Sequence, residues 1–333
     1  AADSPELKRD LDWARPEAKA FEADYKGKLD GLAKAGRLHE AVDRAEKLGD
    51  VTGRLSAFSY LRYALATQDP EKSKFLGDIG PALTDLSTGL LFWELELNRI
   101  DDAVIEAAMA TDEDLARYRH WFAELRKAKP YQLDDKLEEL FHEKSVTGAA
   151  AWNRLFDETM SSLQFEVDGE KLPIEGTLHL LSDRDEKKRE TAFHALGKTL
   201  EDNKRLFTHI TNVLAKDKEI SDRWRGFKDI ADSRHMANSV EREVVDALES
   251  AVRAAYPRLS HKYYQMKAKW FGKDQLNAWD RNAPLPTSDD RTFDWETAKT
   301  TVLEAYGSFS PKLREVAEPF FAGGWIDGPV KQG

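Results

Sequence analysis

Helical periodicity is the feature that most constrains the fold of this 333-residue chain. Three long segments, residues 133–156, 192–214 and 240–270, repeat their apolar side chains at steps of three and four positions. Such steps put the apolar residues of a segment on one face of a helix, whereas a half-buried strand needs strict alternation. The periodicity therefore predicts a mainly α protein, built as an array of many helices.

Capping and breaking residues predict where several helices begin and end. Residues 111–114 (TDED) and 182–186 (SDRDE) are typical of helix starts with acidic first turns. Ser310 followed by Pro311 places a proline at the first helical position. Asp69–Pro70 and residues 77–81 are predicted to separate two early helices.

One segment has the periodicity of strands instead. Residues 163–174 alternate apolar and polar side chains around Asp168 and Gly169. Asp-Gly between alternating runs is the strongest short-range signal for a β-hairpin. We therefore expect one small hairpin in an otherwise helical protein, with Pro173 suited to an edge position.

Composition excludes several classes of protein. The formal net charge of −11 argues against a general nucleic-acid binder, which needs a basic face to neutralise phosphates. The chain has no cysteine, which excludes disulfide scaffolds, Cys–zinc sites and thiol catalysis. No apolar run approaches the roughly 18 residues of a membrane span, so no membrane segment is expected. A hydrophobic fraction of 41% is ample for a core.

The eight histidines do not complete the helical zinc-peptidase motif, in which two His stand four positions apart and Glu follows the first. His39-Glu40 is followed at the fourth position by Asp43. His142-Glu143 is followed there by Val146. Phosphate-binding glycine loops and nucleophile elbows are also missing. From the residues alone, the pattern favours a non-enzymatic helical scaffold that binds peptides or a partner protein.

Several ordered motifs nevertheless resemble those of oligoendopeptidase F, a family of thimet-oligopeptidase-like zinc metallopeptidases. The resemblance covers roughly residues 20–333, with weaker signals before residue 130. The motifs are residues 142–148 (HEKSVTG), 151–158 (AWNRLFDE), 165–170 (FEVDGE), 214–225 (LAKDKEISDRWR), 233–238 (SRHMAN), 279–285 (WDRNAPL), 305–311 (AYGSFSP) and 324–327 (GWID).

This resemblance implies a cytoplasmic, mostly helical zinc metalloendopeptidase that cleaves short peptides inside a deep channel. In the family, an H-E-x-x-H helix holds the zinc ion, and the resemblance places that helix beyond Gly333. We therefore expect an amino-terminal portion that forms channel wall, restricts access and is inactive alone, so no catalytic or metal-binding residue is assigned to it. The expected domains are a helical domain at 1–130, a helical segment with the hairpin at 131–200, and the start of the catalytic domain at 201–333.

The residues expected to lie nearest a bound peptide are those in irregular segments next to charges. They are Arg234, His235, Asp280, Arg281 and Asn282. Residues of this kind on a rigid scaffold often contact ligands. The alternative is that Arg234 and Asp280 cap helices or pair with neighbouring charges.

Two further hypotheses about function stay open beside the peptidase. One is the scaffold described above. The other is an ancillary chain that reassembles with a separate carboxy-terminal catalytic part, since domains divided at exposed loops can stay associated. Helix faces left without that part would be exposed, which predicts self-association or a tight partner.

Overall fold

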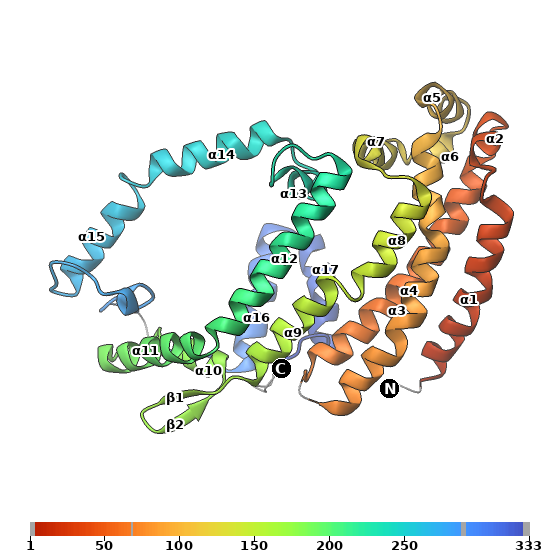
Figure 1. Cartoon of the computed structure of the whole chain (residues 1–333). Coiled ribbons are helices and arrows are strands. Elements are labelled where there is room, and N and C mark those ends of the chain that lie inside the picture. The colour runs from red at the N-terminus through yellow and green to blue at the C-terminus, as the bar shows by residue number, and fades with distance from the viewer. Residues whose placement is uncertain (1–3, 68, 288–290, 329–333) are drawn as a thin grey trace. The chain divides into compact units, whose positions relative to one another are not determined.

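The computed structural model describes residues 4–67, 69–287 and 291–328, and confirms a mainly α fold with one small hairpin (Figure 1). The chain forms two compact units, each built from two separate stretches. The first unit is Ala1–Leu163 with Lys198–Tyr256, and the second is Gln164–Gly197 with Pro257–Gly333. The three consecutive domains expected from the sequence divide the chain differently and stay a prediction.

The first unit is entirely helical in its described residues. Its elements are α1 (Pro5–Tyr25), α2 (Leu29–Lys34), α3 (Leu38–Ala64), α4 (Pro70–Arg99), α5 (Asp102–Thr111), α6 (Glu113–Ala116), α7 (Arg119–Lys127), the 3-10 turn η1 (Lys129–Tyr131), α8 (Asp135–Ser145), α9 (Ala149–Ser162), α12 (Lys204–Arg225), α13 (Asp232–Ala237) and α14 (Arg242–Ala255).

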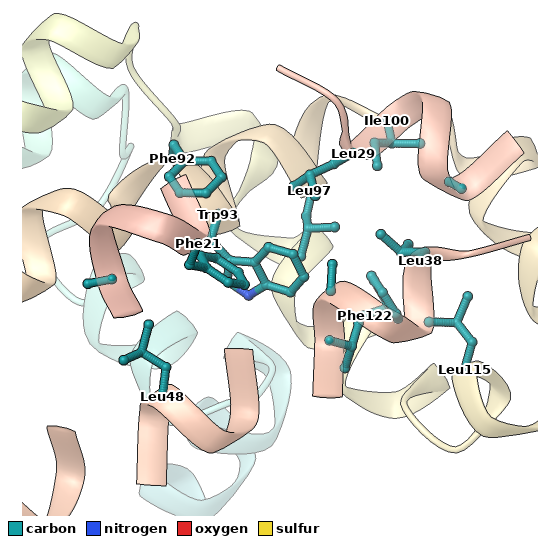
Figure 2. Close-up of a cluster of buried hydrophobic side chains, with 14 of the residues drawn as sticks. Phe21, Leu29, Leu38, Leu48, Phe92, Trp93, Leu97, Ile100, Leu115 and Phe122 are labelled. Carbon is teal, nitrogen blue, oxygen red and sulfur yellow. The ribbon is translucent and has the colours of Figure 1, made fainter. Parts of the chain in front are cut away.

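The main hydrophobic core lies among α1 to α7 of this unit (Figure 2). Phe21 of α1 is fully buried, and its ring centroid lies 5.5 Å from that of Trp93 and 5.7 Å from that of Phe92, both on α4. Leu48 of α3 and Leu97 of α4 are also fully buried. Because burying an aliphatic or aromatic side chain contributes about 1.5–3 kcal/mol, these long helices are held chiefly by their shared apolar faces.

The predicted break at Asp69–Pro70, between α3 and α4, and the predicted helix start at residues 111–114 are confirmed. Asp69 accepts hydrogen bonds from the amides of Glu71 and Lys72 at the start of α4, and Asp112 caps α6. The predicted break at residues 77–81 is wrong, because α4 continues through Pro81 to Arg99. A proline inside a helix removes one backbone hydrogen bond. Ile79 and Leu86 on either side of it are buried in the core, which holds the helix together there.

Each of the three periodic segments is interrupted rather than one continuous helix. The first breaks at residues 146–148, where Gly148 leaves the helical region with φ −94° and ψ −123°. The second breaks at Asn203, and the third between Ala255 and Ser260. Pro257 lies in the last gap, and a proline ring cannot continue a helix without losing a hydrogen bond. The spacing of apolar residues alone does not predict such breaks.

The second unit contains the hairpin and several shorter helices. Its elements are β1 (Phe165–Val167), β2 (Glu170–Leu172), α10 (Ile174–Leu180), α11 (Glu186–Asp202, whose last turn belongs to the first unit), α15 (Ser260–Trp270), the 3-10 turn η2 (Ala278–Asp280), α16 (Trp295–Phe309) and α17 (Pro311–Ala322). The predicted starts of α11 after residues 182–185 and of α17 at Pro311 are confirmed.

The hairpin is formed as predicted. Strands β1 and β2 pair antiparallel, with Phe165 opposite Leu172 and Val167 opposite Glu170. Asp168 (φ 52°) and Gly169 (φ 86°) are both in the left-handed region that a tight two-residue turn requires. Phe165 is fully buried and Val167 nearly so, so one face of the hairpin packs inward.

None of the helices in the described residues is both long enough and apolar enough to cross a bilayer.

Candidate functional site

A cavity of about 750 Å³ in the second unit brings together two of the predicted site residues, Arg281 and Asn282. Aromatic side chains from three elements contribute to its wall: Phe193 of α11, Tyr264 of α15 and Trp279 of η2. Its polar lining includes His261, Gln265, Asp274, Asn277, Arg281 and Asn282. Ligand sites typically combine an apolar surface with a few polar groups in a volume of this order.

A partly buried group of charges, with Asp280 and Arg189 at its centre, holds the cavity's residues 277–282 in place. The carboxylate of Asp280 is completely buried and accepts a hydrogen bond from Nη2 of Arg189 at 2.7 Å. Its other oxygen accepts from Nζ of Lys273 at 2.7 Å. Lys273 also pairs with Glu186 at 2.5 Å. Because both oxygens of Asp280 are occupied, this carboxylate positions its neighbours and is not free to bind a ligand.

The backbone of the same segment is fixed by further hydrogen bonds. The side chains of Asn277 and Asp280 form a reciprocal capping box around η2, in which Asp280 accepts from the amide of Asn277 at 3.0 Å. Nζ of the buried Lys267 donates to the carbonyl oxygen of Arg281 at 2.8 Å. Sites held by such supporting bonds are more precise than those on unsupported loops. The turn therefore presents Trp279, Arg281 and Asn282 from a rigid base.

The charges of the cluster shift one another's protonation equilibria. Burial by itself raises the pKa of Asp280, but hydrogen bonds from Lys273, Arg189 and the Asn277 amide outweigh it and leave that pKa below its ordinary value. Burial by itself lowers the pKa of Lys273, but the hydrogen bonds of Lys273 to Asp280 and Glu186 outweigh burial and leave that pKa above its ordinary value. Burial and the nearby Arg189 lower the pKa of Lys267. The ionised form of Asp280 is thus the one that the fold stabilises.

The five predicted site residues fall in two places. Arg281 and Asn282 line the cavity and are exposed, whereas Asp280 is buried in the ion cluster and is not part of the lining. This arrangement matches the alternative that Asp280 pairs with neighbouring charges. Arg234 is exposed and His235 half-buried on α13, in the other unit. A role for these two residues in peptide contact stays a prediction.

Several residues of the site were missed from the sequence. Arg189 and Glu186 lie about ninety positions before Asp280, and no local pattern links them to it. Tyr264 has a weak signal in the pair Tyr263-Tyr264, which could stack on a ligand, although aromatic residues on helices are more often core. In the structure Tyr264 lines the cavity and 38% of its surface is exposed.

Within residues 4–67, 69–287 and 291–328, no three or more His, Asp or Glu side chains lie together in a way that could hold a metal ion. These residues do not fit the zinc site implied by the resemblance. The groups that the cavity offers to a ligand include one guanidinium, several amides and aromatic faces.

Two family models match the chain in consecutive order. The model described as Oligopeptidase F matches residues 96–165, and the model described as Peptidase family M3 matches residues 179–304. Together the two matches cover more than half of the chain, and the second includes the whole of residues 277–282. They agree with the resemblance drawn from the motifs.

Named relatives point to the same family. The chain is 25% identical over 313 residues to oligopeptidase PepF of Bacillus subtilis (strain 168), covering 91% of this chain and 46% of that protein. It is 25% identical over 248 residues to the group B oligopeptidase PepB of Streptococcus agalactiae serotype III (strain NEM316), covering 73% of this chain and 41% of that protein. The chain thus spans less than half the length of these relatives.

A solved structure shares the fold. Oligoendopeptidase-F from Enterococcus faecium superposes with a TM-score of 0.76 at 17% sequence identity, covering 92% of this chain and 62% of the other.

Proposed function

Because this chain belongs to the oligoendopeptidase F-like peptidases of family M3, we propose that it is the peptide-binding, access-restricting part of a zinc-dependent oligopeptidase. The complete enzyme would hydrolyse short peptides in the cytoplasm, and this part would form wall of its channel. The observation that carries the proposal is the rigid turn at residues 277–282, which presents recognition groups and is held by the buried Arg189–Asp280 ion pair.

Each recognition group of the cavity suits a peptide. The guanidinium of Arg281 can pair with a peptide carboxylate, and planar bidentate pairing makes Arg well suited to that group. The side-chain amides of Asn277 and Asn282 can donate to and accept from a peptide backbone. Trp279 and Tyr264 offer aromatic faces to apolar side chains of the peptide.

Hydrolysis would depend on groups beyond these recognition residues. In the complete enzyme, zinc would supply an activated water. We propose that the 333-residue chain binds peptides but does not cleave them alone. A carboxy-terminal catalytic part, joined or separate, would be its partner.

The proposal is tested by measuring binding and hydrolysis side by side. An internally quenched fluorescent peptide of about eight residues is incubated with the 333-residue chain and added zinc, and the same peptide is titrated by fluorescence anisotropy. We expect binding without hydrolysis. Hydrolysis by the purified chain alone would show that the catalytic groups lie within it. Reading the encoding frame beyond Gly333 for an H-E-x-x-H motif tests the catalytic partner directly.

A non-enzymatic scaffold is the second candidate, favoured by an exposed apolar face on α14. Val244, Leu248 and Val252 stand four positions apart on that helix and are 55%, 63% and 41% exposed. A face of this kind suits a partner protein. If a longer reading frame contains no zinc motif, and no activity appears when a homologous catalytic part is added, the scaffold is the better account.

A further inference from the structure

A second cavity, of about 780 Å³, lies in the first unit and is lined chiefly by α3 and α4. We call it the α3–α4 cavity. Phe21, Leu48 and Trp93 of the hydrophobic core contribute to its lining (Figure 2). Leu83, Leu86 and Leu90 contribute from α4. A predominantly apolar cavity of this volume falls in the range of small-molecule sites.

The helix α3 leaves this space open because it carries glycine at two lining positions. Gly49 and Gly53 stand four residues apart, hence on one face of the helix. A Cβ atom built at either position would meet no other atom within 4 Å. Glycine in a helix interior costs about 1 kcal/mol relative to alanine.

One carboxylate in the lining has no partner. Of the two acidic lining residues, Glu46 is hydrogen-bonded to Tyr118, and that bond together with burial raises the pKa of Tyr118 to about 12. Glu94 has no hydrogen-bond or ion-pair partner among the described residues. Glu94 is exposed to solvent where it lines the cavity, although desolvation by the surrounding protein still raises the pKa of its carboxyl. None of the described lining residues is basic.

We infer that the α3–α4 cavity binds a small organic cation, with an apolar body of about the size of a phenylalkyl group and one primary ammonium group. The apolar body would fill the space beside Gly49 and Gly53. The ammonium group would donate to the carboxylate of Glu94 in a charge-assisted hydrogen bond. The site is distinct from the peptide-binding cavity, which lies in the other unit.

A matched pair of probes tests both parts of this inference. 4-Phenylbutylamine and 4-phenylbutan-1-ol have similar shapes, but only the amine is charged at pH 8. Each is titrated into the 333-residue chain and followed by ligand-observed NMR. We expect the amine to bind about tenfold more tightly than the alcohol, since one charge-assisted hydrogen bond accounts for a difference of that order. Failure of the amine to bind, or equal affinity for both probes, would overturn the inference.

Two variants locate the site. Glu94→Gln keeps the shape of the cavity and should weaken the amine about tenfold while leaving the alcohol unchanged. Gly53→Leu fills the cavity and should abolish binding of both probes. The matched controls are Glu71→Gln and Gly77→Leu, because both positions are exposed on α4 outside the lining and Gly77 also has open space around its Cβ. Unchanged amine binding in Glu94→Gln, or in folded Gly53→Leu, would place the ligand elsewhere.

Discussion

The carboxylate of Asp280 and the guanidinium of Arg189 meet at 2.7 Å, with side-chain exposures of 0% and 1%. Arg189 also donates to the carbonyl oxygens of Asp183 and Arg184 at 2.8 and 2.9 Å. The pair thus joins the segment before α11 to the turn that carries Arg281 and Asn282. These bonds offset part of the cost of removing the two charges from water, which is several kcal/mol for each charge.

Asp280→Ala is therefore expected to destabilise the protein by about 3–5 kcal/mol, because it leaves Arg189 buried without its counter-ion. The free energy of unfolding from urea titration measures this loss. The matched control is Glu201→Gln, which removes an exposed pair with Lys204 and should change stability by less than about 1 kcal/mol. Equal effects of the two substitutions would mean that the buried pair is not a main support of this unit.

The same pair predicts a pH dependence of stability. The folded state holds the pKa of Asp280 below its ordinary value, so the unfolded state takes up a proton first as the pH falls. The stabilisation is complete above the unfolded pKa of about 3.9 and disappears as the pH drops through the folded pKa. The difference in unfolding free energy between the wild type and Asp280→Asn should thus be greatest near pH 7 and shrink below about pH 4. A difference independent of pH would exclude the charge of Asp280 as its cause.

The sequence predicts the elements of this fold better than their assembly. The Asp168-Gly169 turn and the Asp112 cap are set by neighbouring residues, and both were predicted from them. The pairing of Asp280 with Arg189 spans 91 positions, so only the folded chain brings the two together. Pro81 shows the opposite case, in which a strong local breaker is overridden by the burial of Ile79 and Leu86.

Peptide recognition by Arg281 gives a prediction that separates binding from stability. Its side chain is exposed at the cavity, so Arg281→Ala should leave the unfolding free energy within about 0.5 kcal/mol of the wild type. It should weaken a peptide with a free carboxy-terminus about tenfold, and the amidated peptide much less. Fluorescence anisotropy measures both affinities. The control is Arg258→Ala, at an exposed position outside the cavity lining. An equal loss of peptide affinity in this variant would show that Arg281 has no specific role in binding.

Two glycine substitutions should have opposite effects on stability, one in the hairpin turn and one inside α11. Gly169 has φ 86°, so Gly169→Ala should cost about 1 kcal/mol and lower the melting temperature by roughly 2–4 °C. Gly197, inside α11, has an ordinary helical φ and open space at its Cβ, so Gly197→Ala should stabilise by up to about 1 kcal/mol. Thermal unfolding followed by circular dichroism measures both. Stabilisation by Gly169→Ala would contradict the turn geometry.

The exposed apolar face of α14 predicts self-association of the isolated chain. This face is a row of exposed aliphatic side chains, formed by Val244, Leu248 and Val252. Burying such a row against a second copy or a partner removes it from water, which stabilises the complex by about 25 cal/mol for each Å² of apolar surface buried. Sedimentation velocity at increasing concentration should show dimers or larger species, and Leu248→Glu should shift them towards monomer. Ser250→Glu adds the same charge on the opposite side of the helix and should leave the distribution unchanged, because Ser250 is about 200° from Leu248 around the helix axis. A chain that stays monomeric at all concentrations would show that this face is stable in water without a partner.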